Sequence, residues 1–363
     1  MSGGVDSSTA AALLKREGYD VIGVGLRLAD SPAAGESEGS CCGLEGMDDA
    51  RRVASRIGIP FYVLNYEKIF KESVIDYFCR AYLSGETPNP CIECNRIVKF
   101  GHLLRFADLL GASYIATGHY ARIFQDRKTR RCLLKKGRDP RKDQSYFLYS
   151  LTQEQLSRIL FPLGEMTKEE TRKLAKSFGL DTCEKPASQD VCFLGNEDYR
   201  DFLARKFPDL LVPGPIVNMQ GRILGRHRGV AFYTVGQRRG LGVATGAPLH
   251  VVTVETNTGR IVVGTKEETL KRRISLNSVN WISFNSPGDS LSLNVKIRYR
   301  HQERPALVFN RQDGRADIQF SIPQPAPAAG QSAVFYEGDL VVGGGIIEKK
   351  QNESEQENQR DET

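Results

Sequence analysis

The sequence lacks both the long apolar runs of membrane proteins and the dense cysteines of disulfide scaffolds. No apolar run in the 363 residues reaches about 18 residues, so no membrane-spanning helix is expected. The opening MSGGVDSSTA has neither a basic nor an apolar segment, which argues against a secretory signal peptide. Eight cysteines are too few for a disulfide scaffold. We therefore expect a cytoplasmic protein, in which cysteines are more often catalytic or metal-binding than paired.

The length and composition are those of a folded protein with two or three domains. Hydrophobic residues make up 40% and charged residues 26% of the chain, enough to bury a sizeable core. The net charge is +6 and is unevenly distributed. Residues 126–143 contain nine Lys or Arg and three Asp, and residues 222–240 contain five Arg and no acid. Such clusters favour a polyanionic partner, with a solvated surface loop as the alternative.

Secondary-structure patterns divide the chain into three regions. Short strands at 20–28, 59–64 and 114–117 alternate with helices at 7–17, 47–57, 67–83, 96–110, 153–160, 168–178 and 197–207. This alternation predicts a doubly wound parallel sheet in an α/β domain at 1–207. A Pro/Gly-rich boundary precedes a small β-rich domain at 208–273, with strands expected at 214–224, 230–233, 250–255 and 260–264. Further strands predict a C-terminal β-barrel at 274–347, and the polar tail 348–363 is expected to be disordered.

A glycine- and serine-rich loop leads directly into the first predicted helix. It comprises Ser2, Gly3, Gly4, Val5, Asp6, Ser7 and Ser8. Its glycines let backbone N–H groups approach an anion, while the helix N-terminus and the serines add positive potential and donors. The loop lacks the Gly-Lys-Ser/Thr of P-loop nucleotide triphosphatases. It resembles the SGGxDS loop of the PP-loop pyrophosphatase superfamily, whose members split ATP into AMP and pyrophosphate. A turn that only caps a helix is the alternative.

Cys94 and Cys192 are the cysteines with the clearest functional context. Cys94 lies at a predicted loop-to-helix junction, where thiols generally ionise more readily. Cys91 and Cys94 form a C-x-x-C, which alone is compatible with a zinc half-site, a redox pair or chance. Because no second C-x-x-C or paired histidines follow, a structural zinc site is not expected.

Several further motifs resemble those of the tRNA-specific 2-thiouridylase family over nearly the whole chain. Besides the first loop, they are Asn89-Pro90 with Cys94-Asn95, ATGHYAR at 116–122, KDQSYFL at 142–148, SQDVCF at 188–193, TVGQRRGLG at 234–242 and GQSAVFY at 330–336. Blocks in this order are far more specific than the first loop alone. The resemblance implies ATP-dependent sulfur transfer to C2 of the wobble uridine of tRNA.

The resemblance also implies roles for individual residues. Cys192 matches the cysteine that carries a persulfide, and Cys94 matches the second catalytic cysteine. Nucleotide-contacting positions are the first loop, Leu26 and Gly118, and the cofactors are ATP and Mg²⁺. Positions that touch tRNA are Asn89, Pro90, Cys91, His119, Lys142, Asp143, Gln144, Arg298, Tyr299 and Gln331. The implied partners are tRNAs of the Lys, Glu and Gln type, and a cysteine desulfurase or sulfur-relay protein.

Two departures from the family pattern affect what can be transferred. Relatives have an apolar strand directly before the first loop, whereas Ser2 here follows only Met1, so we expect the loop to lack an anchor. Many relatives have Asp where this chain has Cys91, so no acid–base role transfers to that position. Cys91, Cys94 and Cys192 could instead hold a [4Fe–4S] cluster. We favour the persulfide route, because two thiols suffice for it.

Two other functions remain open at this stage. Another PP-loop ligase or amidotransferase acting on a small molecule would not need the basic stretch or the cysteine pair. The second alternative is a non-catalytic protein with a degenerate ATP site that binds RNA or an iron–sulfur cluster. Release of pyrophosphate that depends on added tRNA would separate these alternatives.

Overall fold

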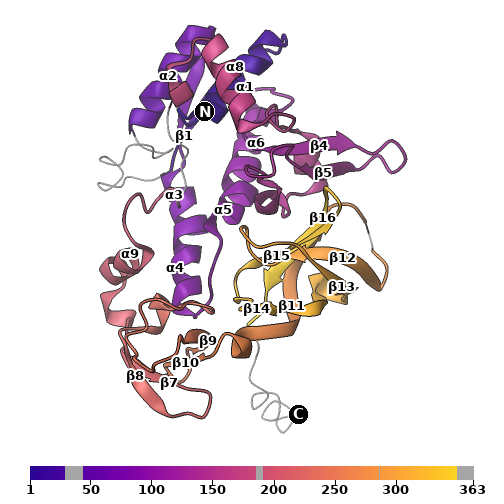
Figure 1. Ribbon diagram of the computed structural model, residues 1–363. Coiled ribbons are helices and arrows are strands. Elements are labelled where there is room, and N and C mark those ends of the chain that lie inside the picture. Colours follow the sequence, from indigo (N-terminus) through magenta and orange to yellow (C-terminus); the bar gives the residue numbers. More distant parts are fainter. Residues whose placement is uncertain (29–43, 185–190, 286, 350–363) are drawn as a thin grey trace.

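The computed structural model describes residues 1–28, 44–184, 191–285 and 287–349. Figure 1 shows an α/β region, a small β-rich region formed by β7–β10, and a β-barrel beside the α/β region. The predicted order of an α/β domain, a β-rich domain and a barrel is therefore confirmed. Among the described residues, no helix combines the length and apolarity needed to cross a membrane. Residues 350–363 of the expected disordered tail and the first residues of the SQDVCF motif, Ser188 to Asp190, lie outside the described residues.

The α/β region contains two separate pairs of parallel strands. β1 (Gly23–Arg27) pairs with β2 (Phe61–Asn65), and β3 (Ile115–Ala116) pairs with β6 (Ile159–Leu160). In the described part of the chain, no strand joins β1 to β3. The expectation that the first loop needs an anchoring strand stays a prediction.

Helices surround these strands and agree with most of the predicted ranges. They are α1 (Val5–Arg16), α2 (Leu44–Ile57), α3 (Glu67–Phe70), η2 (Lys71–Ile75), α4 (Asp76–Leu83), α5 (Pro90–Glu93), η3 (Cys94–His102), α6 (Leu103–Leu109), η4 (Ser145–Leu148), α7 (Gln153–Ser157), α8 (Lys168–Ser177), η5 (Asp181–Glu184), α9 (Tyr199–Lys206) and η6 (Pro208–Leu210). Two of them, η2 and η3, are π-helical, which sequence patterns do not reveal. The helix expected at 153–160 is too long, because the chain leaves it after Ser157 to pair Ile159 with Ile115.

The β-rich region is a four-stranded sheet in the order β8-β7-β10-β9. Its strands are β7 (Gly214–Val217), β8 (Ile223–His227), β9 (His250–Glu255) and β10 (Arg260–Gly264). The strand expected at 230–233 is wrong. Residues Val230–Phe232 form the 3₁₀ turn η7, because the N–H of Phe232 bonds locally to the Gly229 carbonyl.

The C-terminal region is a closed barrel of six antiparallel strands. They are β11 (Leu270–Trp281), β12 (Ser290–Lys296), β13 (Arg304–Asn310), β14 (Ala316–Pro325), β15 (Ser332–Glu337) and β16 (Leu340–Ile347), with short turns η8 (Glu267–Thr269) and η9 (Gln312–Gly314). Pairing of β11 with β16 closes the barrel around a buried core that includes Leu276, Phe320 and Phe335.

A hairpin from the α/β region extends the barrel sheet. β5 (Cys132–Lys136) pairs with β16, and β4 (Ala121–Gln125) pairs with β5. These strands lie partly inside the basic stretch, where charge masked their alternation in the sequence. The hairpin projects beyond the barrel in Figure 1 and ties the α/β region to the barrel through backbone hydrogen bonds.

Candidate active site

The glycine- and serine-rich loop forms the N-terminus of α1, as its sequence predicts. The backbone N–H of Ser2 donates to the Ser7 hydroxyl at 3.1 Å, and that hydroxyl donates to the Gly4 carbonyl at 3.1 Å. Gly3 adopts the left-handed region with φ +73°, and a Cβ there would clash with the Gly46 carbonyl. The loop is thereby closed on itself at a helix N-terminus, the arrangement that favours binding of an anion.

Gly118 lies directly against this loop, although 110 residues separate the two in sequence. A Cβ at Gly118 would stand 2.8 Å from the Ser7 backbone nitrogen and 2.7 Å from the Asp6 carbonyl carbon. Only glycine permits so close an approach of two backbones. The two predicted nucleotide-contacting segments are therefore adjacent in space.

A buried lysine neutralises the one acidic side chain of the loop. Lys168, at the start of α8, is 8% exposed, and its Nζ donates to both carboxylate oxygens of Asp6 at 2.6 and 2.7 Å. The Tyr120 hydroxyl lies 2.8 Å from the same carboxylate. Burial lowers the pKa of Lys168, while the neighbouring Asp6 opposes that shift. Asp6 is thus held in place by two partners distant in sequence.

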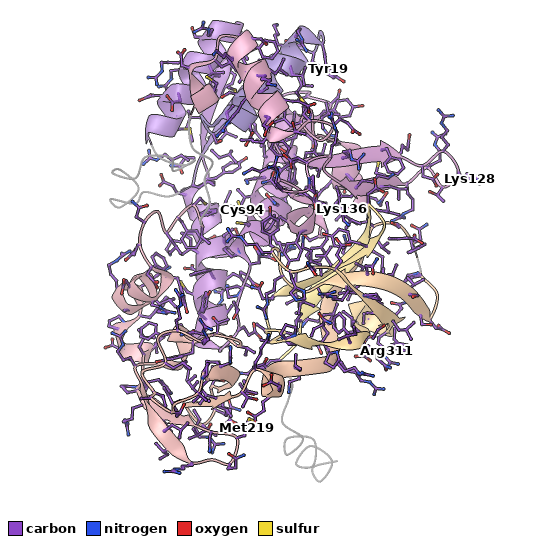
Figure 2. The ribbon with its side chains drawn as sticks, viewed as in Figure 1. Tyr19, Cys94, Lys128, Lys136, Met219 and Arg311 are labelled. Carbon is purple, nitrogen blue, oxygen red and sulfur yellow. The ribbon has the colours of Figure 1, made fainter. Side chains whose placement is uncertain are left out.

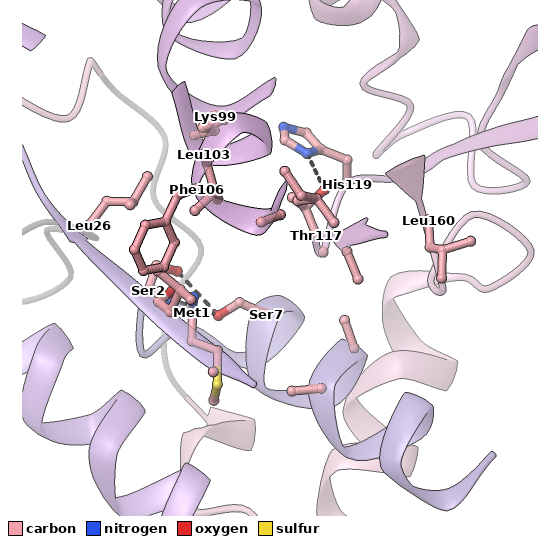
Figure 3. A pocket seen from close by; sticks show the side chains of 18 of the residues that line it. Met1, Ser2, Ser7, Leu26, Lys99, Leu103, Phe106, Thr117, His119 and Leu160 are labelled. Atoms are coloured by element: carbon pink, nitrogen blue, oxygen red, sulfur yellow. Dashed lines mark hydrogen bonds between the residues drawn. The ribbon is translucent and has the colours of Figure 1, made fainter. Parts of the chain in front are cut away.

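A cavity of about 800 Å³ opens beside the loop and gathers most of the predicted site residues. Its walls include β1, β3 and the run from η3 into α6. Figure 3 shows Lys99, Leu103 and Phe106 along that run, with Ser2 and Ser7 on another side and Thr117 and His119 on a third. The predicted residues that line it are Ser2, Asp6, Ser7, Leu26, Pro90, Cys91, Cys94, Gly118, His119, Gln144 and Cys192.

Both predicted catalytic cysteines line this cavity. Cys94 begins η3, is 6% exposed and belongs to a hydrophobic cluster against which Cys192 packs. The neighbour of Cys192, Phe193, is fixed by edge-to-face contacts with Phe70 and Phe78 at ring distances of 5.9 and 5.2 Å. Cys91 also lines the cavity but is exposed. The fold thus brings two thiols that are 98 positions apart in sequence into one chamber.

His119 is held as a neutral imidazole on the cavity wall. Its Nδ1 lies 2.8 Å from the Thr117 hydroxyl, and its ring contacts the rings of Phe100 and Phe161, which also contact each other. Burial, followed by the charge of Lys99, lowers the pKa of His119 to about 3. The ring therefore carries no charge at neutral pH and can act only through hydrogen bonds and stacking.

Two of the predicted tRNA residues outside the cavity, Gln331 and Tyr299, connect the barrel to the α/β region. Gln331 of the barrel donates through its Nε2 to the Thr87 carbonyl at 2.8 Å, just before the Asn89-Pro90-Cys91 segment. Tyr299 packs against Phe147 with ring centres 4.5 Å apart and ring planes tilted by 44°. Arg298 instead donates to the Pro325 carbonyl at 2.8 Å within the barrel.

The three residues Lys142, Asp143 and Gln144 differ in their exposure and in their contacts. Asp143 is buried, and its Oδ1 accepts the Gly137 and Ser145 N–H groups at 3.0 Å, so it stabilises a turn. Gln144 accepts the Tyr120 N–H at 3.0 Å and lines the cavity. Lys142 is partly exposed.

The basic stretch divides into an exposed tip and an engaged base. Lys135 pairs with Asp339, and Lys136 pairs with Glu303 at 2.7 Å, so both side chains hold the hairpin to the barrel. Arg131 donates to the Ile282 carbonyl at 2.9 Å. Arg127, Lys128 and Arg130 are exposed near the turn; Figure 2 shows Lys128 at the far end of the hairpin and Lys136 next to the barrel. A polyanion would meet the tip rather than the base.

Metal-binding donors do not converge in the described part of the chain. No group of three or more His, Cys, Asp or Glu side chains there is arranged to hold a metal ion. Cys91, Cys94 and Cys192 share the cavity wall without forming such a group. The residues therefore do not fit a three-thiolate cluster as they are arranged. A phosphate-bound Mg²⁺ needs only one or two carboxylates. Asp6 is the carboxylate of the loop at the start of α1, and both of its oxygens accept hydrogen bonds from Lys168.

The sequence does not predict that two lysines, Lys99 and Lys168, belong to the site. Lys99 lines the cavity five residues after Cys94, and Lys168 holds Asp6. Lys99 lies within the motif region after Cys94, but nothing in its spacing predicts that it faces the cavity. Lys168 follows the helix-capping Thr167 and has no sequence relation to the loop it contacts.

Comparison with protein families defines the class of this chain. Residues 1–196 match the model described as tRNA methyl transferase HUP domain, 200–265 the tRNA methyl transferase PRC-barrel domain, and 271–347 the aminomethyltransferase beta-barrel domain. The chain is thus a HUP-domain protein with a PRC-barrel domain and a C-terminal β-barrel domain.

Curated relatives narrow this class to one family. The chain is 50% identical to the tRNA-specific 2-thiouridylase MnmA of Moorella thermoacetica, over 96% of this chain and 98% of the relative. It is 47% identical to the MnmA of Clostridioides difficile, over 96% and 97% of the two chains. The chain belongs to the tRNA-specific 2-thiouridylase family. A solved structure, the U34-tRNA thiolase NcsA from Methanococcus maripaludis with its [4Fe–4S] cluster, matches at TM-score 0.33 and 19% identity over 58% of this chain and 65% of that one; this likeness carries no further conclusion.

Proposed function

We propose that the protein uses ATP to replace the C2 oxygen of the wobble uridine of tRNA with sulfur. The observation that carries this proposal is that the glycine- and serine-rich loop and both cysteines line the same cavity. Membership of the 2-thiouridylase family supports tRNA as the substrate. A ligase for a small molecule would need the loop but would have no use for two thiols in the same chamber.

The first chemical step is activation of the base. The C2 oxygen of uridine is a poor leaving group, so it attacks the α-phosphorus of ATP, and pyrophosphate departs. The loop at the start of α1 would bind the departing phosphates through its backbone N–H groups and serines. Asp6, oriented by Lys168, would hold the Mg²⁺ that accompanies them.

The second step transfers sulfur. A persulfide on Cys192 attacks C2 through its terminal sulfur, and AMP leaves with the former C2 oxygen. The Cys94 thiolate then attacks the Sγ of Cys192, which forms a Cys94–Cys192 disulfide and leaves the terminal sulfur on C2 as the thiocarbonyl. A thiol reductant restores both cysteines, and a cysteine desulfurase or relay protein reloads Cys192.

Product analysis with purified components tests this function. Incubation with ATP, Mg²⁺, a persulfide donor, a thiol reductant and wobble-uridine tRNA should yield 2-thiouridine, detected by mass spectrometry, with one pyrophosphate per thiolated tRNA. The matched control is the same tRNA with cytidine at the wobble position, which should release no pyrophosphate. Pyrophosphate release that does not depend on tRNA would contradict the proposal and favour a small-molecule ligase.

A further inference from the structure

The reaction cavity contains little positive charge for a chamber proposed to receive a nucleotide. Among its described lining residues, Lys99 is the only Lys or Arg, whereas Asp6 and Asp20 are acidic. Asp6 already has a cation of its own in Lys168, whose side chain does not line the cavity. Lys99 is therefore the cationic side chain that the described wall of the chamber itself supplies.

The π-helical geometry of η3 explains why Lys99 faces the same chamber as Cys94. In an α-helix, a residue five positions further lies about 140° around the axis, on another side. In a π-helix, hydrogen bonds run from i to i+5, so residues five apart stack on successive turns. η3 is π-helical from Cys94 to His102, and both Cys94 and Lys99 line the cavity.

The electrostatic influence of Lys99 extends over two sides of the cavity. Its charge adds to the effect of burial in lowering the pKa of His119, on the side of β3. It also adds to burial in lowering the pKa of the Met1 amino group, beside the anion-binding loop, to about 6. Lys99 therefore lies close enough to influence both the loop and the wall that includes His119.

We infer that Lys99 is a catalytic residue that binds a non-bridging oxygen of the α-phosphate and stabilises AMP as it leaves the adenylated base. This inference rests on the proposed function. The loop at α1 binds the phosphates that depart in the first step, whereas the α-phosphate stays attached to the base and must lie toward the cysteines. When sulfur displaces AMP, the electron pair of the C2–O bond passes to the phosphate, and a fixed ammonium group stabilises that charge without proton transfer.

Equilibrium binding of AMP and of adenosine tests this inference without requiring turnover. Lys99→Met should weaken AMP binding by about tenfold or more, the usual effect of losing a hydrogen bond to a charged group, and leave adenosine binding within about twofold. Lys99→Arg should retain most of the preference for AMP. Arg105→Met removes one positive charge from an exposed position of the adjoining α6 and should bind both ligands as the native protein does.

Single-turnover kinetics add a second readout. Lys99→Met should slow 2-thiouridine formation more than pyrophosphate release, because the lysine acts on the second step. Unchanged AMP affinity in Lys99→Met, or an equal loss for AMP and adenosine, would overturn the inference. If native protein prefers AMP through Lys99 but makes no 2-thiouridine, the proposed function fails while the phosphate contact stands. If Lys99→Met makes 2-thiouridine at the native rate, the catalytic role fails while the function stands.

Discussion

The α/β region and the C-terminal barrel differ in how closely their strands are packed: the barrel encloses a filled core, whereas strands of the α/β region face a cavity. In the barrel, the pairing of β11 with β16 removes the sheet edges, and Val308, Ile318 and Phe335 are completely buried. In the described residues of the α/β region, β1 and β3 each have one strand partner and face a cavity of about 800 Å³. The barrel acts as a rigid support, whereas the α/β region keeps open space for its reactive groups. Gln331 and the β4–β5 hairpin connect the two regions.

The largest expected effect is a loss of thiolation without a loss of stability, caused by a substitution in the cavity of the α/β region. Cys192→Ser removes the proposed sulfur carrier and should lower thiolation by more than about 10³-fold, because the serine hydroxyl cannot form a persulfide. Affinity for tRNA and thermal stability should stay near native values. Cys183→Ser, which alters a thiol outside the cavity, is the matched control. Thiolation at the native rate by Cys192→Ser would contradict its assignment as the carrier.

A substitution in the barrel core should instead lower stability and leave nucleotide binding unchanged. Phe335→Ala leaves a cavity among completely buried side chains and should lower the free energy of unfolding by about 3–5 kcal/mol. Nucleotide affinity of the folded protein should not change. Leu307→Ala, at a position that is 43% exposed in the same barrel, should lower stability far less. Equal losses in the two variants, measured by denaturant unfolding, would argue against a tightly packed barrel.

An intermediate effect is expected at the glycine- and serine-rich loop. Lys168→Met removes the partner that orients the Asp6 carboxylate, so Asp6 would no longer be held where the proposed function needs it for Mg²⁺ and the phosphates. We expect ATP affinity to fall by about tenfold at constant Mg²⁺, measured by calorimetry. Lys173→Met removes an exposed lysine from the same helix and should have no effect. ATP affinity unaffected by Lys168→Met would show that the ion pair is only a support for α8.

The smallest expected effect concerns the hairpin that links the two regions. Replacing Arg127, Lys128 and Arg130 by Ala should weaken tRNA binding several-fold. It should also reduce the salt slope of log K by about 0.9 for each phosphate that the tip neutralises. Lys135 and Lys136 stay unchanged in this variant, because acidic groups of the barrel engage both, and their replacement should destabilise the hairpin instead. An unchanged salt slope in the tip variant would show that the tip faces away from RNA.

Much of the site was predictable because its groups have local signatures. The loop at Ser2–Ser8 is recognisable by glycines and serines before a helix, and it does form the start of α1. The C-terminal β-barrel was also predicted from the sequence, because short strands recur there, and the closed six-stranded barrel confirms it. The β4–β5 hairpin was missed because basic residues obscured its alternation, and its pairing partner β16 lies about 200 residues away.

The sequence by itself determined which reactive groups the protein possesses and the type of most of its helices and strands. Those properties depend on residue chemistry and short-range periodicity. Tertiary structure alone decided that Cys94 and Cys192 share a chamber, that Lys168 reaches Asp6, and that the barrel side chain of Gln331 contacts the loop before Asn89. It also decided that Lys99 faces the cavity, because the switch from α- to π-helical bonding in η3 rotates each later side chain about the helix axis. Such contacts depend on long-range packing, for which a single sequence carries no local signal.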